Sequence, residues 1–119
     1  MTFYDSHGKA VAYLDNDEKH IFLYSGKPVA YLHDVAVYGF NGRHLGWFQN
    51  GWIRDLRGYC VFFTEDATGS GPAKPAKSAR PAKSARSAKP AKSAKYAKHA
   101  KAANSLSWSI LSGEAFFNQ

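Results

Sequence analysis

This chain has a single cysteine and no long apolar run. Between residues 72 and 104 it also has no acidic side chain. Cys60 is the only cysteine, so neither an internal disulfide nor a thiolate metal cluster can form. No apolar stretch approaches the roughly 20 residues that cross a bilayer. The first residues have neither the basic region nor the apolar run of a secretory signal. These absences predict a cytoplasmic protein, because the cytoplasm is the reducing compartment in which lone thiols are ordinary.

Charge is divided unevenly along the 119 residues. Residues 1–71 hold six basic and eight acidic side chains, residues 72–104 hold ten basic and no acidic ones, and residues 105–119 hold only Glu114. The formal net charge of +7 and the isoelectric point near 9.6 therefore originate in one segment. Such a charge bears on partners and solubility rather than on fold. We expect a folded domain over 1–71, a basic segment over 72–104 and a closing segment over 105–119.

A repeat of 16 to 18 residues organises the first part of the chain, and four glycines mark it. Each glycine is followed three residues later by a branched aliphatic residue, and two residues further by an aromatic one. The glycines are Gly8, Gly26, Gly42 and Gly58; the aliphatic residues are Val11, Val29, Leu45 and Val61; the aromatic residues are Tyr13, Tyr31, Trp47 and Phe63. Self-similarity at a fixed spacing indicates one supersecondary unit per copy.

Each of these glycines lies between two short runs of aromatic or branched residues, which predicts four β-hairpins. A two-residue X-Gly loop of type I′ is the expected turn, since it requires positive φ, and Asn41-Gly42 is its strongest instance. By the period of two along a strand, the aliphatic and aromatic positions should share one face. One hairpin is marginal in water, so four copies should bury that face together.

We therefore predict an all-β fold of four hairpins about a pseudo-fourfold axis, with the four aliphatic residues as equivalent core positions. The alternative is an eight-strand meander rolled into a half barrel.

These residues resemble the 4-fold beta flower domain, a family of small bacterial proteins built from four hairpins around a pseudo-fourfold axis. The segments that carry the resemblance are Gly26–Leu32, Asn41–Phe48, Gly51–Asp55 with Gly58, Gly71-Pro72 before the Lys/Pro/Ala repeats, and Trp108-Ser109 with Phe116-Phe117. The resemblance covers nearly the whole chain. It implies a fold, and it carries over no catalytic residue.

From Pro72 the chain becomes a strict three-residue repeat in which every triplet supplies one cation. The ten cations are Lys74, Lys77, Arg80, Lys83, Arg86, Lys89, Lys92, Lys95, Lys98 and Lys101. This composition cannot bury enough apolar surface to offset the entropy of ordering, so we predict disorder. Four prolines favour polyproline II over the first two-thirds of the segment. Residues 93–103 contain no proline and suit a helix that forms on a partner.

We expect this segment to bind DNA, RNA or another polyanion without sequence preference, because lysine and arginine release counterions from phosphates. Tyr96 is its only aromatic residue, so it has no stacking platform. An anionic membrane surface is disfavoured, since the segment lacks an apolar face. The alternative is a structural or protein-interaction module in which the basic segment is only a tether or solubilising spacer.

The last fifteen residues return to a composition that is typical of folded chains. Their apolar residues are Leu106, Trp108, Ile110, Leu111, Phe116 and Phe117. Exposed together they would form a patch of the kind that soluble monomers avoid, so we predict that they are buried against the hairpins. A short helix should begin near Ile110, capped by Ser107 or Ser109. A tail that is free at one end is the alternative.

No catalytic motif is readable, so we expect no enzymatic activity and no cofactor. The five histidines, His7, His20, His33, His44 and His99, show no metal-ligand spacing. The first three fall in predicted turns, where solvated polar residues are ordinary. Cys60 should be a small buried residue of a strand.

Residue types that often bind ligands, namely His, Trp, Arg and Asp, are densest in the third and fourth repeats. They are His44, Trp47, Trp52, Arg54, Asp55 and Arg57. Arg54 and Arg57 beside Asp55 suit an anion or a ligand mouth shared with the tryptophans, since interfaces favour tryptophan and arginine. The competing interpretation buries both tryptophans in the core, binds Asp55 to turn amides and leaves the arginines on the surface.

Overall fold

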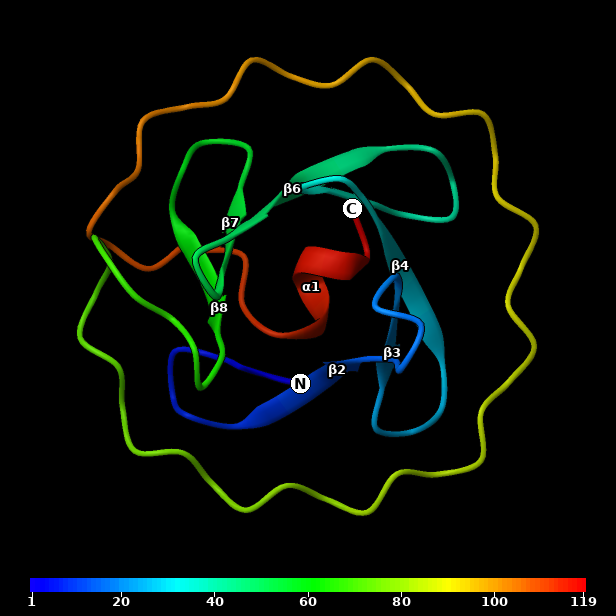
Figure 1. The fold of residues 1–119 in the computed structure, drawn as a ribbon, viewed down its shortest axis with the longest axis horizontal. Helices are drawn as coiled ribbons and strands as arrows, with labels where there is room; N and C mark the ends of the chain where they lie inside the picture. The colour runs from blue at the N-terminus through cyan, green and yellow to red at the C-terminus, as the bar shows by residue number, and fades with distance from the viewer.

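The computed structural model describes all 119 residues, and its body is a closed barrel of eight antiparallel strands in chain order (Figure 1). The strands are β1 (Thr2–Tyr4), β2 (Ala10–Leu14), β3 (His20–Leu23), β4 (Pro28–His33), β5 (Ala36–Tyr38), β6 (His44–Gln49), β7 (Trp52–Asp55) and β8 (Cys60–Phe63). β8 pairs with β1 through Phe63 and Tyr4. The all-β prediction of four hairpins is confirmed, and the barrel is closed rather than half open.

The hairpins β1–β2, β3–β4, β5–β6 and β7–β8 close with three-residue loops that end in glycine. In the first, the Gly8 N–H donates to the Asp5 carbonyl and the Asp5 N–H donates to the Lys9 carbonyl, both at 2.9 Å. Only Gly8 in this loop has positive φ, at +79°. This is a type I turn followed by a left-handed glycine, so the predicted type I′ turn is wrong. The residue before each glycine needs no positive φ, which is why His7, Ser25, Asn41 and Arg57 all fit there.

A β-bulge in each hairpin changes the face of the sheet on which the side chains beyond it lie. The register shifts between Phe3 and Tyr4 in the first hairpin, and at the equivalent places in the other three. The extra residue on the opposing strand breaks the period of two, so Val11 packs on the inner cluster whereas Tyr13 belongs to an outer one. The prediction of a shared face is wrong for this reason. The four aliphatic positions still meet in one core, as predicted.

The barrel therefore has two apolar layers. The inner layer fills the barrel with aliphatic residues, alanines, Phe3 and Phe62. The outer layer, on the outside of the strands, holds most of the aromatic rings that the strands carry: Tyr4, Tyr13, Phe22, Tyr31, Tyr38, Trp47, Trp52 and Phe63. All eight residues are buried. An apolar surface of this extent needs a cover that excludes water.

Helix α1 (Glu114–Phe117) lies on the barrel axis and closes one end (Figure 1). Phe116 is fully buried, and Phe117 stacks on Phe62 with ring centroids 5.4 Å apart. The predicted docking of the closing segment is confirmed, but the helix begins at Glu114 rather than near Ile110. Its N-cap is Gly113, with no side-chain cap. None of the helical structure is long or apolar enough to span a bilayer.

Residues 105–111 pass beside β8, where Trp108 forms a parallel bridge with Cys60. The Cys60 N–H donates to the Ser107 carbonyl (3.1 Å), and the Ser109 N–H donates to the Cys60 carbonyl (2.8 Å). The segment reaches the barrel through Trp108, whose ring lies 6.1 Å from those of Trp52 and Phe63. Residues beside this contact face solvent, with Leu106 65% and Ile110 91% exposed. The prediction that the whole apolar set is buried is wrong for these two residues.

Residues 72–104, here called the belt, circle the barrel once in an extended course (Figure 1, green through yellow to orange). At the polyproline II rise of ~3.1 Å per residue, a segment of this length spans about 100 Å. That is the circumference of a circle about 33 Å across, and the molecule measures 35 × 35 × 23 Å. The prediction of disorder is wrong, and in the free chain residues 93–103 take the same extended course. Composition describes the segment in isolation, whereas the barrel supplies its hydrogen-bond and packing partners.

Replacing Phe116 with alanine should lower the free energy of unfolding by about 3 to 5 kcal/mol, because a large void would open where α1 closes the barrel. The matched control is Ile110→Ala, an exposed position of the same segment, which should change it by less than about 0.5 kcal/mol. Chemical denaturation followed by tryptophan fluorescence measures both. Equal effects of the two substitutions would contradict the role of α1 as a plug.

Candidate functional site

The belt, together with Ser105 directly after it, is attached to one turn glycine in every hairpin, and these attachments recur every nine residues. In each, a backbone N–H donates to the carbonyl oxygen of the turn glycine at 2.8 to 3.1 Å. The donors are Ser78, Ser87, Tyr96 and Ser105, and the acceptors in the same order are Gly8, Gly26, Gly42 and Gly58. Nine residues are three triplets. The three-residue sequence repeat is therefore a nine-residue structural repeat that matches the fourfold barrel.

The turn glycines are required for two reasons. Their φ angles, between +79° and +95°, suit glycine. In addition, a Cβ atom at Gly8 would lie 1.9 Å from the carbonyl oxygen of Ala76. The corresponding distances are 2.0 to 2.1 Å at Gly26, Gly42 and Gly58, toward Ala85, Ala94 and Ala103. The belt backbone thus lies directly on the turns, and a side chain there would lift it away.

The first residue of a triplet is proline only where no barrel group accepts its N–H. The prolines are Pro72, Pro75, Pro81 and Pro90, and proline has no N–H to donate. The other triplet-initial residues, Ser78, Ser84, Ser87, Ser93, Tyr96 and His99, all donate to the barrel. The order of proline and serine therefore follows the positions of the acceptors on the barrel.

The ten belt cations divide into three sets, because each nine-residue repeat holds three. Two sets make contacts within the protein. Lys77, Lys83, Arg86, Lys92 and Lys95 have their charged groups 4.3 to 5.9 Å from the ring centroids of Tyr4, Tyr13, Phe22 or Tyr31. Lys74 donates to the Ala67 carbonyl and Lys101 to Asn104 Oδ1, both at 2.8 Å. The third set, Arg80, Lys89 and Lys98, makes no hydrogen bond, ion pair or ring contact.

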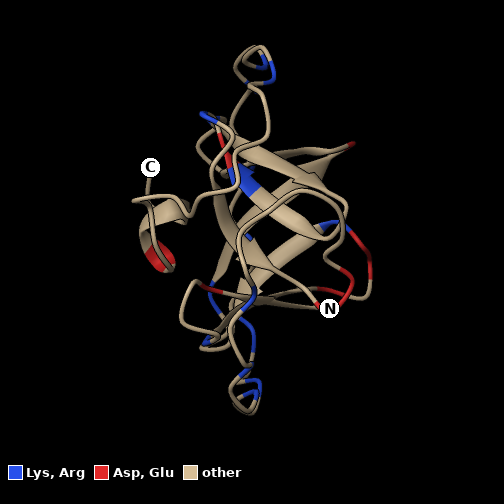
Figure 2. Ribbon diagram, turned by 90° about the vertical axis from the view of Figure 1, so that its left-hand side faces the viewer, with Lys and Arg blue, Asp and Glu red and all other residues tan.

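Almost none of this positive charge is compensated. Arg86 and Asp15, 2.6 Å apart, form the one ion pair of the belt, and all ten cationic residues are exposed. Figure 2 shows the belt edge-on, with α1 at one end of the barrel and acidic residues, in red, on connecting loops at the other. The outcome is a ring of positive charge around a body whose residues 1–71 carry a net charge of −2.

Arg54 holds the two ends of the belt together. It is only 4% exposed, and its guanidinium donates to the carbonyls of Gly58 (2.8 Å), Ser105 (2.7 Å) and Ser70. Ser70 precedes the belt and Ser105 follows it, so one side chain binds both ends. Arg54 takes the bulge position that Tyr4, Phe22 and Tyr38 take in the other hairpins. It is thus buried rather than on the surface, since its five donors suit several carbonyls at once.

Of the other residues of the patch predicted in the third and fourth repeats, Asp55 and Arg57 line one groove, whereas Trp47, Trp52 and His44 lie elsewhere. Trp52 and Trp47 are buried in the outer layer, and Trp52 Nε1 donates to the Thr68 carbonyl at 2.9 Å. Asp55 accepts from the turn amides of Arg57 and Tyr59, at 2.9 and 3.0 Å. Arg57 is exposed above the ring of Tyr59, whereas His44 lies beneath another part of the belt. The structure does not gather this patch into one ligand site.

His44 lies on β6 beneath the third quarter of the belt, the stretch around Tyr96 and His99. Its Nε2 donates to the Gly46 carbonyl (2.9 Å) and its Nδ1 accepts the His99 N–H (3.0 Å), so the ring is neutral. Burial lowers the pKa of His44; the hydrogen bond to Gly46 opposes this, and the charges of His99 and Lys98 add to it. The neutral ring is therefore part of the belt attachment.

Two further titratable side chains were expected in particular places. Cys60 is buried, as predicted, and burial raises the pKa of its thiol to about 11. His20 was expected in a turn, but it is buried on β3, where Nδ1 contacts Asp17. No three His, Cys, Asp or Glu side chains gather where they would hold a metal ion.

The attachment of the belt was not predicted from the sequence, although the sequence holds a signal for it. Proline never occurs at residues 78, 87, 96 and 105, nine residues apart, while it occurs at other triplet positions. A missing proline at a fixed period indicates an N–H group that is in use. The roles of Arg54 and His99 have no comparable signal, because each occurs once.

Ser87→Pro should loosen the belt, because it removes the N–H that donates to Gly26, whereas Ser87→Ala keeps that N–H. One lost hydrogen bond costs roughly 1 kcal/mol. This corresponds to about a fivefold increase in the fraction of molecules in which this stretch of the belt is detached from the barrel. We expect faster tryptic cleavage after Lys83 and Lys92, measured by mass spectrometry. Ala102→Pro, at a position whose N–H has no partner, is the second control. Equal cleavage of all three variants would contradict the attachment.

Acid should loosen the third quarter of the belt. Above its ordinary pKa of 6.5, His44 is neutral in both the folded and the unfolded chain. Its contribution to the stability of the belt attachment is then at its full value. As the pH falls below that value the unfolded chain takes up the proton first, so this contribution declines. Hydrogen exchange at the His99 amide should accelerate toward about pH 5, beyond the intrinsic rate change, relative to the Ser87 amide. His44→Ala should abolish that excess; an unchanged excess would contradict this assignment.

Comparison with known proteins agrees with this architecture. The family model described as 4-fold beta flower protein matches residues 1–117, a range that includes the barrel, the belt and α1. Comparison with curated proteins and with solved structures gives no match. Because the match extends over almost the full length, the chain belongs to the 4-fold beta flower family.

Proposed function

We propose that this protein is a non-catalytic binding module that holds nucleic acid, or another flexible polyanion, on its basic belt without sequence preference. The observation that carries the proposal is the ring of ten exposed cations with a single ion pair. Lysine and arginine gain affinity for phosphates by releasing condensed counterions. Backbone hydrogen bonds hold the belt in place, so little further ordering of the belt is needed when a ligand binds.

The curvature of the belt favours single strands over duplexes. A DNA duplex has a persistence length of about 50 nm, so it would touch only a short arc of a molecule 35 Å across. A flexible single strand can bend around the rim and contact cations along its whole length. Arg80, Lys89 and Lys98 are the strongest candidates for phosphate contact, because they have no partner within the protein.

We also propose a cytoplasmic setting. The single cysteine is buried and its raised pKa keeps it a thiol, which suits the reducing compartment. Nucleic acid is abundant in the same compartment.

A protein-interaction module is the second candidate. Leu106 and Ile110 are exposed apolar residues, and Ile110 helps to line a groove of about 450 Å³ whose other lining residues are Trp108, Leu111, Tyr59, Asp55 and Arg57. Exposed apolar patches often mark contacts between proteins. The docked course of the belt does not favour the version in which the basic segment is a flexible tether.

Changing Arg80, Lys89 and Lys98 together to glutamine should weaken binding of a fluorescent single-stranded oligonucleotide. Each lost phosphate contact lowers the salt slope by about 0.7 for single strands, so we expect a decrease of about 2. Fluorescence anisotropy between roughly 50 and 200 mM salt measures this slope, the range over which such contacts act most visibly. Thermal stability should change little, because these side chains make no hydrogen bond, ion pair or ring contact in the fold.

The control keeps the charges and changes the residue types, as R80K, K89R and K98R. Binding should be retained, since phosphate contacts of this kind depend on charge. A duplex of the same length should bind more weakly and with a smaller salt slope. Failure of the unsubstituted protein to bind any oligonucleotide at low salt would overturn the proposal and favour the protein-interaction module.

A further inference from the structure

One quarter of the belt departs from the nine-residue repeat. Tyr96 takes the position that serine takes at Ser78, Ser87 and Ser105. His99 follows three residues later, where the preceding quarters have Pro81 and Pro90. Beneath it, His44 takes the strand position of Ala10, Pro28 and Cys60. Three bulky side chains with polar groups thus replace small or apolar ones, all in the same quarter.

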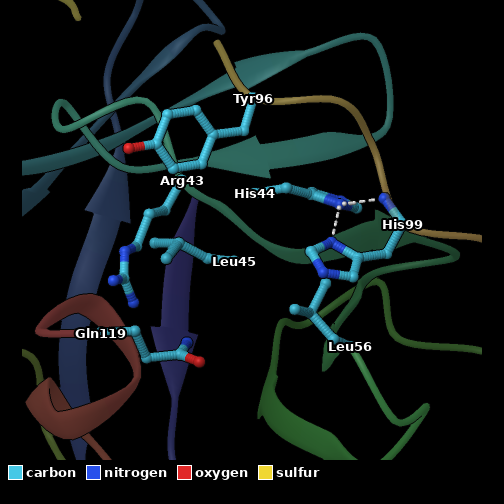
Figure 3. Close-up of a pocket in the computed structure, with 7 residues that line it drawn as sticks. All are labelled: Arg43, His44, Leu45, Leu56, Tyr96, His99 and Gln119. Carbon is cyan, nitrogen blue, oxygen red and sulfur yellow. Dashed lines mark hydrogen bonds between the residues drawn. The ribbon is translucent and has the colours of Figure 1, made fainter.

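These departures surround a pocket of about 280 Å³ (Figure 3). Its lining residues are Arg43, His44, Leu45, Leu56, Tyr96, His99 and Gln119. In the close-up, Arg43 lies on one side and the two histidines on the other, with Tyr96 above and Leu45 between them. A planar group on one face, a cation on another and leucines behind them make a site of mixed chemistry.

The polar groups that face this pocket have few partners in the protein. The Arg43 guanidinium makes no hydrogen bond or ion pair, and neither does the Tyr96 hydroxyl. His99 Nδ1 lies 3.4 Å from His44 Nδ1, and no acidic side chain lines the pocket. Arg43 therefore supplies a positive charge to the pocket, and its guanidinium is not bound by an acceptor of the protein.

Tyr96 is held by its backbone, while its ring is left open. Its N–H donates to Gly42 (2.9 Å) and its carbonyl accepts the Tyr38 hydroxyl (3.0 Å). The residue is nonetheless 62% exposed, although tyrosine in a folded chain usually covers its ring. A fixed, exposed ring is a stacking surface for a planar ligand, and such stacking tolerates any base.

We infer that this pocket is a seat for one nucleotide, with the base stacked on Tyr96 and the phosphate bound by Arg43 and the His99 ring. The planar guanidinium fork fits a phosphate with two parallel hydrogen bonds. Leu45 and Leu56 form the apolar wall that limits water at the phosphate. The inference deepens the proposed function, on which it rests, by placing one nucleotide of a bound strand at a defined point on the belt.

The test is an NMR titration with adenosine monophosphate, ribose 5-phosphate and inorganic phosphate. Adenosine monophosphate should bind most tightly, with shifts in the Tyr96 and His99 signals. Tyr96→Ser, which restores the residue of the other quarters and keeps the N–H, should weaken it roughly tenfold or more and leave ribose 5-phosphate unchanged. Tyr96→Phe keeps the ring and should retain binding. Arg43→Gln should weaken both phosphorylated ligands.

The outcomes separate this seat from the belt as a whole. The double variant R80Q/K89Q, outside the pocket, should weaken oligonucleotide binding and leave adenosine monophosphate binding unchanged. If oligonucleotides do not bind but adenosine monophosphate does, the proposed function fails and the seat stands. If adenosine monophosphate binds no better than ribose 5-phosphate, or Tyr96→Ser has no effect, the seat is overturned, whatever the oligonucleotides do.

Discussion

The hydrogen bond that each turn glycine accepts, from a belt N–H or from Ser105 directly after the belt, is the contact on which the rest of the structure depends. It fixes the distance between neighbouring attachments at nine residues, and with it the place of every triplet. It brings the lysine and arginine side chains over the outer aromatic layer. Without this cover, eight large aromatic residues would face water on a small barrel. The belt is therefore part of the fold, and the folded unit is the whole chain.

The closed barrel explains why the cover is needed at all. Eight short strands enclose a narrow interior, which the aliphatic residues, two phenylalanines and α1 already fill. The bulges then direct the tyrosines and tryptophans of each hairpin outward, where a soluble protein would ordinarily carry polar side chains. The inner and outer layers are carried by the same strands. A shift in the pairing register of any two strands would therefore disturb both layers.

Much of the body could be predicted from the sequence, because the glycine-anchored repeat is local and occurs four times. The aliphatic core positions followed from that repeat, and the docking of Phe116 and Phe117 followed from the apolar composition of the closing segment. The face of Tyr13 could not be predicted, since a bulge depends on pairing with the neighbouring strand. The belt was misjudged because its order comes from acceptors on the turns, not from its own composition. Arg54 acts through carbonyls of Ser70 and Ser105, residues brought together only by the full circuit.

Because nine belt residues match one hairpin, shortening the belt and lengthening it have different consequences for its attachment. A quarter spans about 28 Å at the polyproline II rise, whereas six residues reach at most roughly 21 Å even when fully extended. Deleting a single triplet would therefore detach an anchor, while an inserted triplet could bulge outward and leave the anchors in place. Expansion of the Lys/Ala repeat is sterically tolerated and contraction is not, so the number of hairpins sets a minimum for the length of the repeat.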